Sequence, residues 1–183
     1  MDVHPSIATH PNVDQWLEFT ADERIVVHTG KVDIGQRIST ALAIIAAEEL
    51  DVDYNRIDVK RTQTGIDPDE GFTAGSMSMQ HSGSAIRLAS ATTRHYLIDL
   101  AANVLGLAPG TLVVDDGIVR SLVTGAHVSY WSLLTDKSLS VRIDETAPLK
   151  RPADYSWIGK AVIPKGLVDI VREIGRASRR ESG

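Results

Sequence analysis

Hydrophobic and polar positions in the first third of the chain predict a strand, a helix and a second strand region, in that order. Two short β-rich runs, at 16–19 and 23–28, are joined by an acidic turn and predict a hairpin. Residues 38–50 are apolar nearly all round, which is typical of a helix buried on several sides. Residues 56–60 then alternate between apolar and charged side chains, as a half-exposed strand does. We therefore expect the helix to pack against a sheet.

The second half of the chain is predicted to hold the longest helix and a small hairpin. Apolar side chains recur at helical spacing through 84–105, and a glycine follows as a stop signal. The run 112–119 has Asp116-Gly117 near its centre, and this dipeptide supplies the positive φ values that a tight hairpin turn needs. Residues 128–134 fit either a short helix or a strand.

These elements predict an α/β (α+β) fold in which a mixed sheet is packed by two long helices. A chain of 183 residues is long enough to bury the core of one domain. We expect residues 1–12 to form an extended arm and residues 13–147 to form the α/β domain. Residues 148–183, which include three prolines, are expected to form an extended covering segment and a tail.

Charge and cysteine content exclude several classes of function. The chain has 19 basic and 24 acidic residues, and the net charge of −5 argues against nucleic acid or an anionic membrane as the main partner. Cysteine is absent, so this sequence can hold no disulfide, no thiolate-bound metal and no iron–sulfur cluster. No apolar run approaches the length of a membrane helix, and we expect a cytoplasmic location.

Two glycine-containing loops stand directly before the two predicted long helices and form the best candidate for a ligand site. The first loop spans 30–37 (GKVDIGQR) and the second spans 73–78 (TAGSMS). A helix start leaves N–H groups unpaired and carries partial positive charge, so the two loops could form two halves of an anion cradle. The candidate binding residues are Gly35, Gln36, Arg37, Thr73, Ala74, Gly75, Ser76, Met77 and Ser78.

These loops and the residues around them resemble the molybdenum hydroxylases, the family of xanthine dehydrogenase and aldehyde oxidase. The similarity covers roughly residues 13–160 and is strongest to the N-terminal segment of the isoquinoline oxidoreductase type. The resemblance implies part of a molybdopterin-binding α/β domain. It also implies that Gln36 hydrogen-bonds the pterin and that Gly75, Ser76 and Ser78 surround its phosphate end.

The resemblance further implies partner chains. Members of the family pass electrons through iron–sulfur clusters, and their glutamate base lies in a segment that this sequence does not match. We therefore expect a larger molybdopterin-binding polypeptide and an iron–sulfur subunit as partners, or a homo-oligomer, and we assign no catalytic residue and no metal ligand here. The first hypothesis is a small subunit or fragment that supplies part of the molybdopterin pocket for oxidation of N-heterocycles or aldehydes. The second is a non-catalytic α/β structural or interaction module that retains the family fold.

One position departs from the family pattern. The family usually has Gly-Gln-Gly where this chain has Gly35-Gln36-Arg37. If that position requires a positive φ or a close backbone approach, arginine is strained there by about 1 to 3 kcal/mol. Arg37 could instead reach a phosphate, or it could be an ordinary solvated residue at a helix start.

Several other polar residues are weaker candidates. His4 and His10 lie in the predicted arm without a carboxylate at ligand spacing, so we expect no metal there. Asp67, Asp69 and Glu70 lack the glycine and the terminal glutamate of a calcium-binding EF-hand loop, and an acid/base pair is the other possibility. A solvated acidic loop is the favoured interpretation of these three carboxylates.

Two arginines in the longest predicted helix leave three possibilities open. Arg87 and Arg94 lie seven positions apart and therefore on about the same helical face. They could pair with acidic residues of a partner, contact the cofactor's phosphate tail, or form a solvated stripe. The arginines within 172–183 are expected to belong to a solvated tail.

Overall fold

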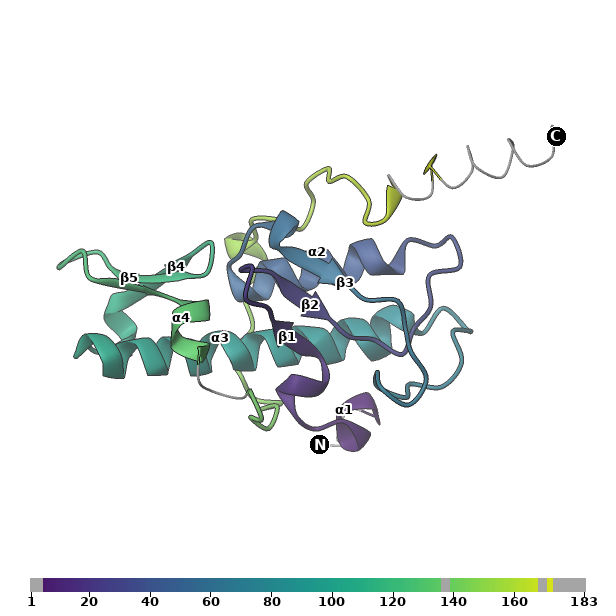
Figure 1. The fold of residues 1–183 in the computed structure, drawn as a ribbon, viewed down its shortest axis with the longest axis horizontal. Coiled ribbons are helices and arrows are strands. Elements are labelled where there is room, and N and C mark those ends of the chain that lie inside the picture. The colour runs from purple at the N-terminus through teal and green to yellow at the C-terminus, as the bar shows by residue number, and fades with distance from the viewer. Residues whose placement is uncertain (1–4, 136–138, 168–170, 173–183) are drawn as a thin grey trace.

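The computed structural model describes residues 5–135, 139–167 and 171–172, and it has the α/β class that the hydrophobic pattern predicts (Figure 1). Two long helices run beside a mixed sheet, and a second small sheet lies at one end. The helices and strands are α1 (Pro5–Thr9), β1 (Leu17–Phe19), β2 (Ile25–Val27), α2 (Ile38–Leu50), β3 (Ile57–Val59), α3 (Ser84–Leu105), β4 (Leu112–Asp115), β5 (Ile118–Ser121), β6 (His127–Ser129) and α4 (Tyr130–Leu134). Short 3-10 turns at Val13–Gln15, Tyr54–Arg56, Pro109–Thr111 and Pro152–Asp154 and a π-helical turn at Met79–Gly83 connect them.

The first sheet has the strand order β1-β2-β3 and confirms the predicted hairpin. Strand β2 pairs antiparallel with β1 and parallel with β3, so α2 is the crossover between two parallel strands. Ile25, Val27 and Ile57 are fully buried on the face that packs against α2. The predicted strand, helix and strand therefore form one compact βαβ unit.

Helices α2 and α3 pack directly against each other behind this sheet (Figure 1). Small buried side chains, among them Ala43, Ala46, Ala85 and Ala89, lie in the two helices and allow their backbones to approach closely. Both helices have the bounds that the apolar pattern predicts, and Gly106 ends α3 in the left-handed conformation. No described helix is both long and apolar enough to cross a membrane.

The second sheet, with the order β4-β5-β6, packs on the C-terminal half of α3. The predicted Asp-Gly turn is confirmed, because Asp116 and Gly117 have φ values of 47° and 73°. A Cβ on Gly117 would lie 2.7 Å from the ring of Trp131, so this glycine also permits close packing. The run 128–134 combines both expected structures, since it begins in strand β6 and continues into helix α4.

The N-terminal arm differs from the prediction. Residues 5–9, expected to be extended, form helix α1, in which Ser6 and Ile7 are buried. Trp16 then donates from its indole nitrogen to the carbonyl of His10, so this segment is held against the core. Residues 1–4 and 173–183, which contain His4 and nearly all of the expected tail, lie outside the described residues. The predicted division into arm, domain and covering segment stays a prediction.

Candidate functional site

The structure brings the two predicted loops side by side. The backbone N–H of Val32 in the first loop donates to Thr73 Oγ1 in the second loop, at 2.9 Å and across 41 positions of sequence. Both loops lie at the end of the molecule opposite the second sheet, where α2 begins and where a π-helical turn leads into α3 (Figure 1). The sequence-predicted site is therefore a single place in the fold.

The carboxylate of Glu70 fixes the two loops beside each other. It accepts hydrogen bonds from the backbone N–H of Gly30, the first residue of the first loop, at 3.0 Å and from the hydroxyl of Thr29, the residue before it, at 3.2 Å. It also accepts from the hydroxyls of Ser82, which follows the second loop, and of Ser6 in helix α1. One carboxylate thus ties together three segments that are remote in sequence.

A buried lysine strengthens the same junction. Lys31 is only 3% exposed, and its ammonium donates to the backbone carbonyl oxygens of Glu70 at 2.7 Å and Phe72 at 3.0 Å. Since Phe72 directly precedes the second loop, the lysine fixes the path by which the chain enters that loop. The sequence pattern gave no signal for this role, because the lysine looks like one more exposed charge within a glycine-containing loop.

The expectation of a solvated acidic loop is wrong for two of its three carboxylates. Asp67 is buried and lies 2.6 Å from Nδ1 of His28, whose Nε2 lies 3.3 Å from Glu18. Glu70 is half-buried and accepts the hydrogen bonds described above, whereas Asp69 is exposed. The connecting loop is therefore packed against residues 28–31 and the π-helical turn rather than solvated along its whole length.

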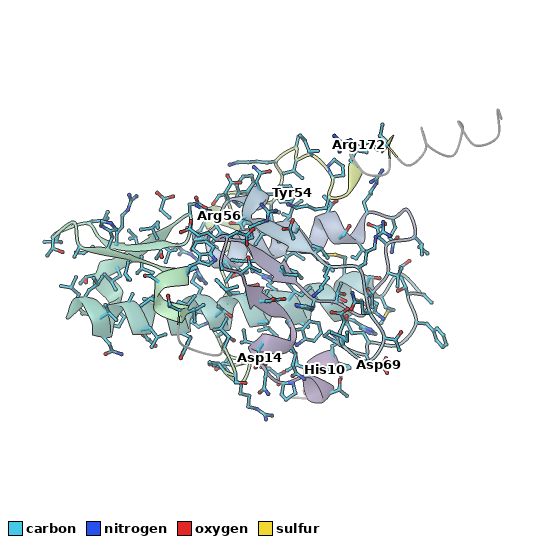
Figure 2. The ribbon with its side chains drawn as sticks, in the orientation of Figure 1. His10, Asp14, Tyr54, Arg56, Asp69 and Arg172 are labelled. Atoms are coloured by element: carbon cyan, nitrogen blue, oxygen red, sulfur yellow. The ribbon has the colours of Figure 1, made fainter. Side chains whose placement is uncertain are left out.

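The predicted absence of a metal site remains an expectation. Within the described ranges, no cluster of three or more metal-ligating side chains occurs. Nε2 of His10 accepts a hydrogen bond from the backbone N–H of Asp69 at 3.3 Å, and Figure 2 shows these two residues close together. This histidine therefore has a structural contact in the fold.

Asp33 closes the N-terminus of helix α2. Its carboxylate accepts from the N–H groups of Gly35 at 3.1 Å and Arg37 at 3.2 Å, and from the hydroxyl of Ser39 at 2.7 Å. Burial acts to raise the pKa of Asp33, but the hydrogen bonds from Ser39, Gly35 and Arg37 outweigh it and lower that pKa. The chain's own carboxylate therefore already occupies the helix start that the sequence suggested for an external anion.

Gln36 braces the first loop from within. Its Oε1 accepts from the N–H of Ile34 at 2.6 Å, and its Nε2 donates to the carbonyl of Val32 at 2.9 Å. An amide can accept two hydrogen bonds and donate two, so one of each remains available. Because the side chain is exposed, Gln36 can hold the loop and still contact a ligand.

Arg37, which stands where the family has glycine, has the strained left-handed backbone that was considered for this position. Its φ is 61° and its ψ is 32°, in the left-handed region that glycine adopts most easily. The side chain is half-exposed at the start of α2, as expected of a residue at a helix start. The structure thus confirms that this position requires a positive φ.

Replacing Arg37 with glycine is expected to stabilise the fold by about 1 kcal/mol, because glycine has no Cβ to penalise the left-handed conformation. Chemical denaturation of purified wild type and variant measures this difference. The control is Arg37→Ala, which removes the guanidinium but keeps the Cβ, and which should leave stability close to that of the wild type. Equal stabilisation by alanine and glycine would contradict the strain argument.

The second loop leaves the hydroxyl groups of its two serines free. Gly75 and Ser76 have φ values of 63° and 56°, and the N–H of Met77 donates to the carbonyl of Ala74 at 3.3 Å, which defines a type I′ turn. Within the part of the chain that the structure describes, the hydroxyls of Ser76 and Ser78 have no hydrogen-bond partner. The loop then enters the π-helical turn, a feature that occurs frequently at functional sites.

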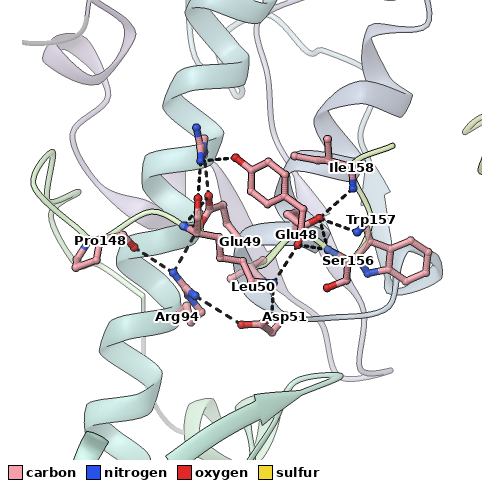
Figure 3. Close-up of polar contacts among 12 residues, drawn as sticks. Glu48, Glu49, Leu50, Asp51, Arg94, Pro148, Ser156, Trp157 and Ile158 are labelled. Carbon is pink, nitrogen blue, oxygen red and sulfur yellow. Dashed lines mark hydrogen bonds and ion pairs between the residues drawn. The ribbon is translucent and has the colours of Figure 1, made fainter. Parts of the chain in front are cut away.

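A second polar cluster lies at the C-terminal end of α2, whereas the two loops lie at its N-terminal end (Figure 3). Glu48 is 1% exposed and accepts from the backbone N–H groups of Ser156, Trp157 and Ile158 at 2.6–3.0 Å. Its carboxylate also accepts from Nζ of Lys150 at 3.0 Å. Burial acts to raise the pKa of Glu48, but these hydrogen bonds outweigh it and lower that pKa.

Glu49 binds both arginines of α3. Nε of Arg87 donates to it at 2.9 Å, and Arg94 lies 3.5 Å away and also contacts Asp51. The arginines therefore do not form a solvated stripe, because their partners are acidic residues of the same chain. Contact with an acidic residue of a partner or with the cofactor's phosphate tail stays a prediction. Together with Glu48, this cluster fastens residues 148–158 across the two helices and belongs to the scaffold rather than to the loops.

Known proteins match most of this chain. A family model described as the molybdopterin cofactor-binding domain matches residues 3–160. A nicotinate dehydrogenase polypeptide of Pseudomonas putida (strain KT2440) is 36% identical over 146 residues, which are 80% of this chain and 12% of that protein. The beta subunit of isoquinoline 1-oxidoreductase from Brevundimonas diminuta is 30% identical over 79% of this chain and 19% of its own length. The chain thus spans a small part of these relatives.

Solved structures share the fold. Reconstituted CO dehydrogenase from Oligotropha carboxidovorans aligns with a TM-score of 0.58 and 20% identity, over 69% of this chain and 16% of that one. Quinoline 2-oxidoreductase from Pseudomonas putida 86 aligns with a TM-score of 0.52 and 21% identity, over 64% of this chain and 15% of that one. At these identities the alignments show a common architecture only.

Proposed function

Since the chain belongs to the family of molybdopterin cofactor-binding domains, we propose that it supplies part of the molybdopterin pocket of a molybdenum hydroxylase. The substrates proposed are N-heterocycles or aldehydes. Relatives named nicotinate dehydrogenase and isoquinoline 1-oxidoreductase support the first substrate class. A relative from Gluconacetobacter polyoxogenes named membrane-bound aldehyde dehydrogenase supports the second.

The observation that carries this proposal is the second loop. A turn with two successive positive φ values places Ser76 on the surface, and half-exposed Ser78 follows it. Neither hydroxyl has a partner within the described residues. These uncharged donors suit the phosphate end of a pterin cofactor, and Gln36 retains one free donor and one free acceptor in the adjacent loop. The donor set therefore fits molybdopterin.

Asp33 and Arg37 determine how the first loop contributes. Since Asp33 closes the start of α2, this helix end is not the proposed phosphate site, and the second loop holds the anionic end of the cofactor. Arg37 lies half-exposed at the same helix start and adds a positive charge beside the loops. The first loop then contacts the pterin through Gln36 and its backbone.

The remaining machinery is proposed to lie on partner chains. Bound molybdenum would supply the oxidation–reduction chemistry, whereas the residues of this chain bind and orient the cofactor. The sequence contains no cysteine for an iron–sulfur cluster, so we propose that a partner carries the clusters. A larger molybdopterin-binding polypeptide would provide the general base and the substrate channel. A relative from Paenarthrobacter nicotinovorans is named as the gamma subunit of a dehydrogenase complex.

The alternative hypothesis, a non-catalytic module that retains the family fold, is not favoured. Arg37 in place of glycine was its main support, and the structure shows that arginine adopts the required backbone conformation. Relatives that match about four fifths of the chain are named as dehydrogenase or oxidoreductase subunits.

Removing both loop hydroxyls is expected to lower cofactor content. In complexes purified from its own cells, the variant Ser76→Ala/Ser78→Ala should bind molybdopterin about a hundredfold or more weakly than the wild type and retain correspondingly less molybdenum and pterin. Each hydrogen bond to a charged group contributes about 1.5–3 kcal/mol, and about 1.4 kcal/mol is a factor of ten in affinity. Metal analysis and pterin fluorescence measure both quantities on the same sample. Thr64→Ala, an exposed hydroxyl in the preceding loop, is the control and should leave both unchanged. A wild-type complex without molybdenum would refute the proposed function.

A further inference from the structure

Large apolar side chains surround the two cradle loops. Phe72 is 95% exposed and Ile34 is 74% exposed, and three further residues of these loops and the π-helical turn are also exposed. We name this group the apolar collar, and its members are Val32, Ile34, Phe72, Met77 and Met79. The two segments that carry the collar lie side by side, because Lys31 donates to the carbonyl of Phe72 and because the N–H of Val32 donates to Thr73.

The collar has the composition of a protein interface. Residues 71–80 contain no charged side chain, although about a quarter of the whole chain is charged (23%). In the first loop Lys31 is buried against two carbonyl oxygens, and the carboxylate of Asp33 accepts from two N–H groups and a hydroxyl. Arg37 is therefore the charged side chain of this loop that no such set of hydrogen bonds covers. Interface centres are depleted in charge and enriched in aromatic residues, methionine and arginine. Single exposed apolar residues are ordinary, but a contiguous group of them marks a contact surface.

We propose that the apolar collar is the docking surface for the polypeptide that carries the rest of the molybdopterin pocket, and that docking closes the cradle from water. For the identity of this partner the inference rests on the proposed function. The matched stretch makes up 12% and 19% of two relatives, so this fold unit is continuous with much more polypeptide in those proteins. The collar borders the proposed cofactor loops, which is where further pocket residues must approach.

Two other partners fit the collar less well. A lipid surface is recognised by clustered lysine and arginine beside apolar residues, and residues 71–80 contain none. A second copy of this chain would bring the same loops to the collar and would add neither a cysteine-bound cluster nor a new kind of pocket residue. The partner therefore presents an apolar, charge-poor protein surface.

The test compares collar variants in the complex purified from native cells. Phe72→Ser and Ile34→Ser are the test variants, and Val123→Ser is the control because Val123 is 88% exposed in the connection between β5 and β6. The partner is identified by peptide sequencing as a molybdenum hydroxylase polypeptide, and its affinity is measured by titration. Each collar variant should bind about tenfold more weakly, as expected of a buried interface anchor, while the control binds like the wild type.

The outcomes separate the docking surface from the cofactor function. Equal binding by wild type and collar variants, or no complex at all, would overturn the inference. A homodimer that Phe72→Ser abolishes would assign the collar to a second copy, and binding to anionic vesicles would assign it to lipid; either result also overturns it. A collar-sensitive complex without molybdenum would refute the proposed function but keep the docking surface. A molybdenum-containing complex that is insensitive to the collar variants would keep the proposed function but refute the docking surface.

Discussion

Replacing Gly30 with alanine is expected to destabilise the fold by about 3 kcal/mol, at the upper end of what overpacking typically costs. A Cβ at this position would lie 2.1 Å from the carbonyl oxygen of Pro68 and 2.9 Å from the backbone nitrogen of Glu70. Both contacts are to backbone, so the connecting loop itself has to move. That movement also breaks the hydrogen bond between the N–H of Gly30 and the Glu70 carboxylate.

Denaturant unfolding of the purified chain measures this effect, and the midpoint should fall without a large change in slope. Gly110→Ala is the matched control, since a Cβ there meets no atom within 4 Å and its φ is not positive. That control should be neutral or slightly stabilising. Because Gly30 sets the spacing of the two loops, we also expect Gly30→Ala to lower the molybdenum content of the purified complex. Unchanged stability would show that the loops adapt without strain.

Replacing Glu48 with alanine is expected to cost about 3 to 5 kcal/mol, the usual penalty for breaking a buried charged network. The substitution leaves the N–H groups of Ser156, Trp157 and Ile158 without their shared acceptor. It also removes one of the two carboxylates that contact Nζ of Lys150. Residues 148–158 should then detach from α2 at lower denaturant concentration than the rest of the fold.

The lowered pKa of Glu48 also makes the stability of the fold depend on pH. Its pKa is lower in the folded chain than the unfolded value of about 4.3, so its stabilisation is fully present above roughly pH 5. As pH falls through the folded-state pKa, the carboxylate becomes protonated and the contribution is lost. Unfolding midpoints measured between neutral and acid pH should therefore fall more steeply for the wild type than for Glu48→Ala.

An exposed ion pair provides the comparison. Asp154→Ala removes the partner of Arg151 on the surface, and we expect the unfolding midpoint to stay close to that of the wild type. If Glu48→Ala behaved like this surface variant, the cluster at the end of α2 would not hold the covering segment in solution.

Local pattern was sufficient for most of the helices and strands of this fold. The bounds of α2 and α3 match the predicted ranges because an apolar surface at helical spacing is a property of neighbouring residues. The Asp116-Gly117 turn was predictable for the same reason, since positive φ is a preference of the residues themselves. Helix α1 was missed because its five residues are too short to show a period, and its burial depends on contacts with distant segments.

The candidate site likewise has features that local sequence predicted and features that it did not. The two loops were found from their glycines and their positions before helices, and the structure brings them into contact. The partners of Glu70 lie 12 to 64 positions away, so nothing near it in the sequence distinguishes it from Asp69, which is exposed. A carboxylate on a buried helix is the one available signal for Glu48, because such a charge requires partners from elsewhere in the fold.

The sequence by itself therefore determined most of the secondary structure, the family resemblance and the two loops, because each depends on residue type and spacing over short stretches. Tertiary structure alone decided that Asp33 rather than an external anion closes α2, and that Arg87 and Arg94 serve Glu49. It also decided that the loop apolar residues remain exposed as a collar. These outcomes depend on which side chains meet across many residues of sequence, and that is fixed only when the packed core sets the distances between them.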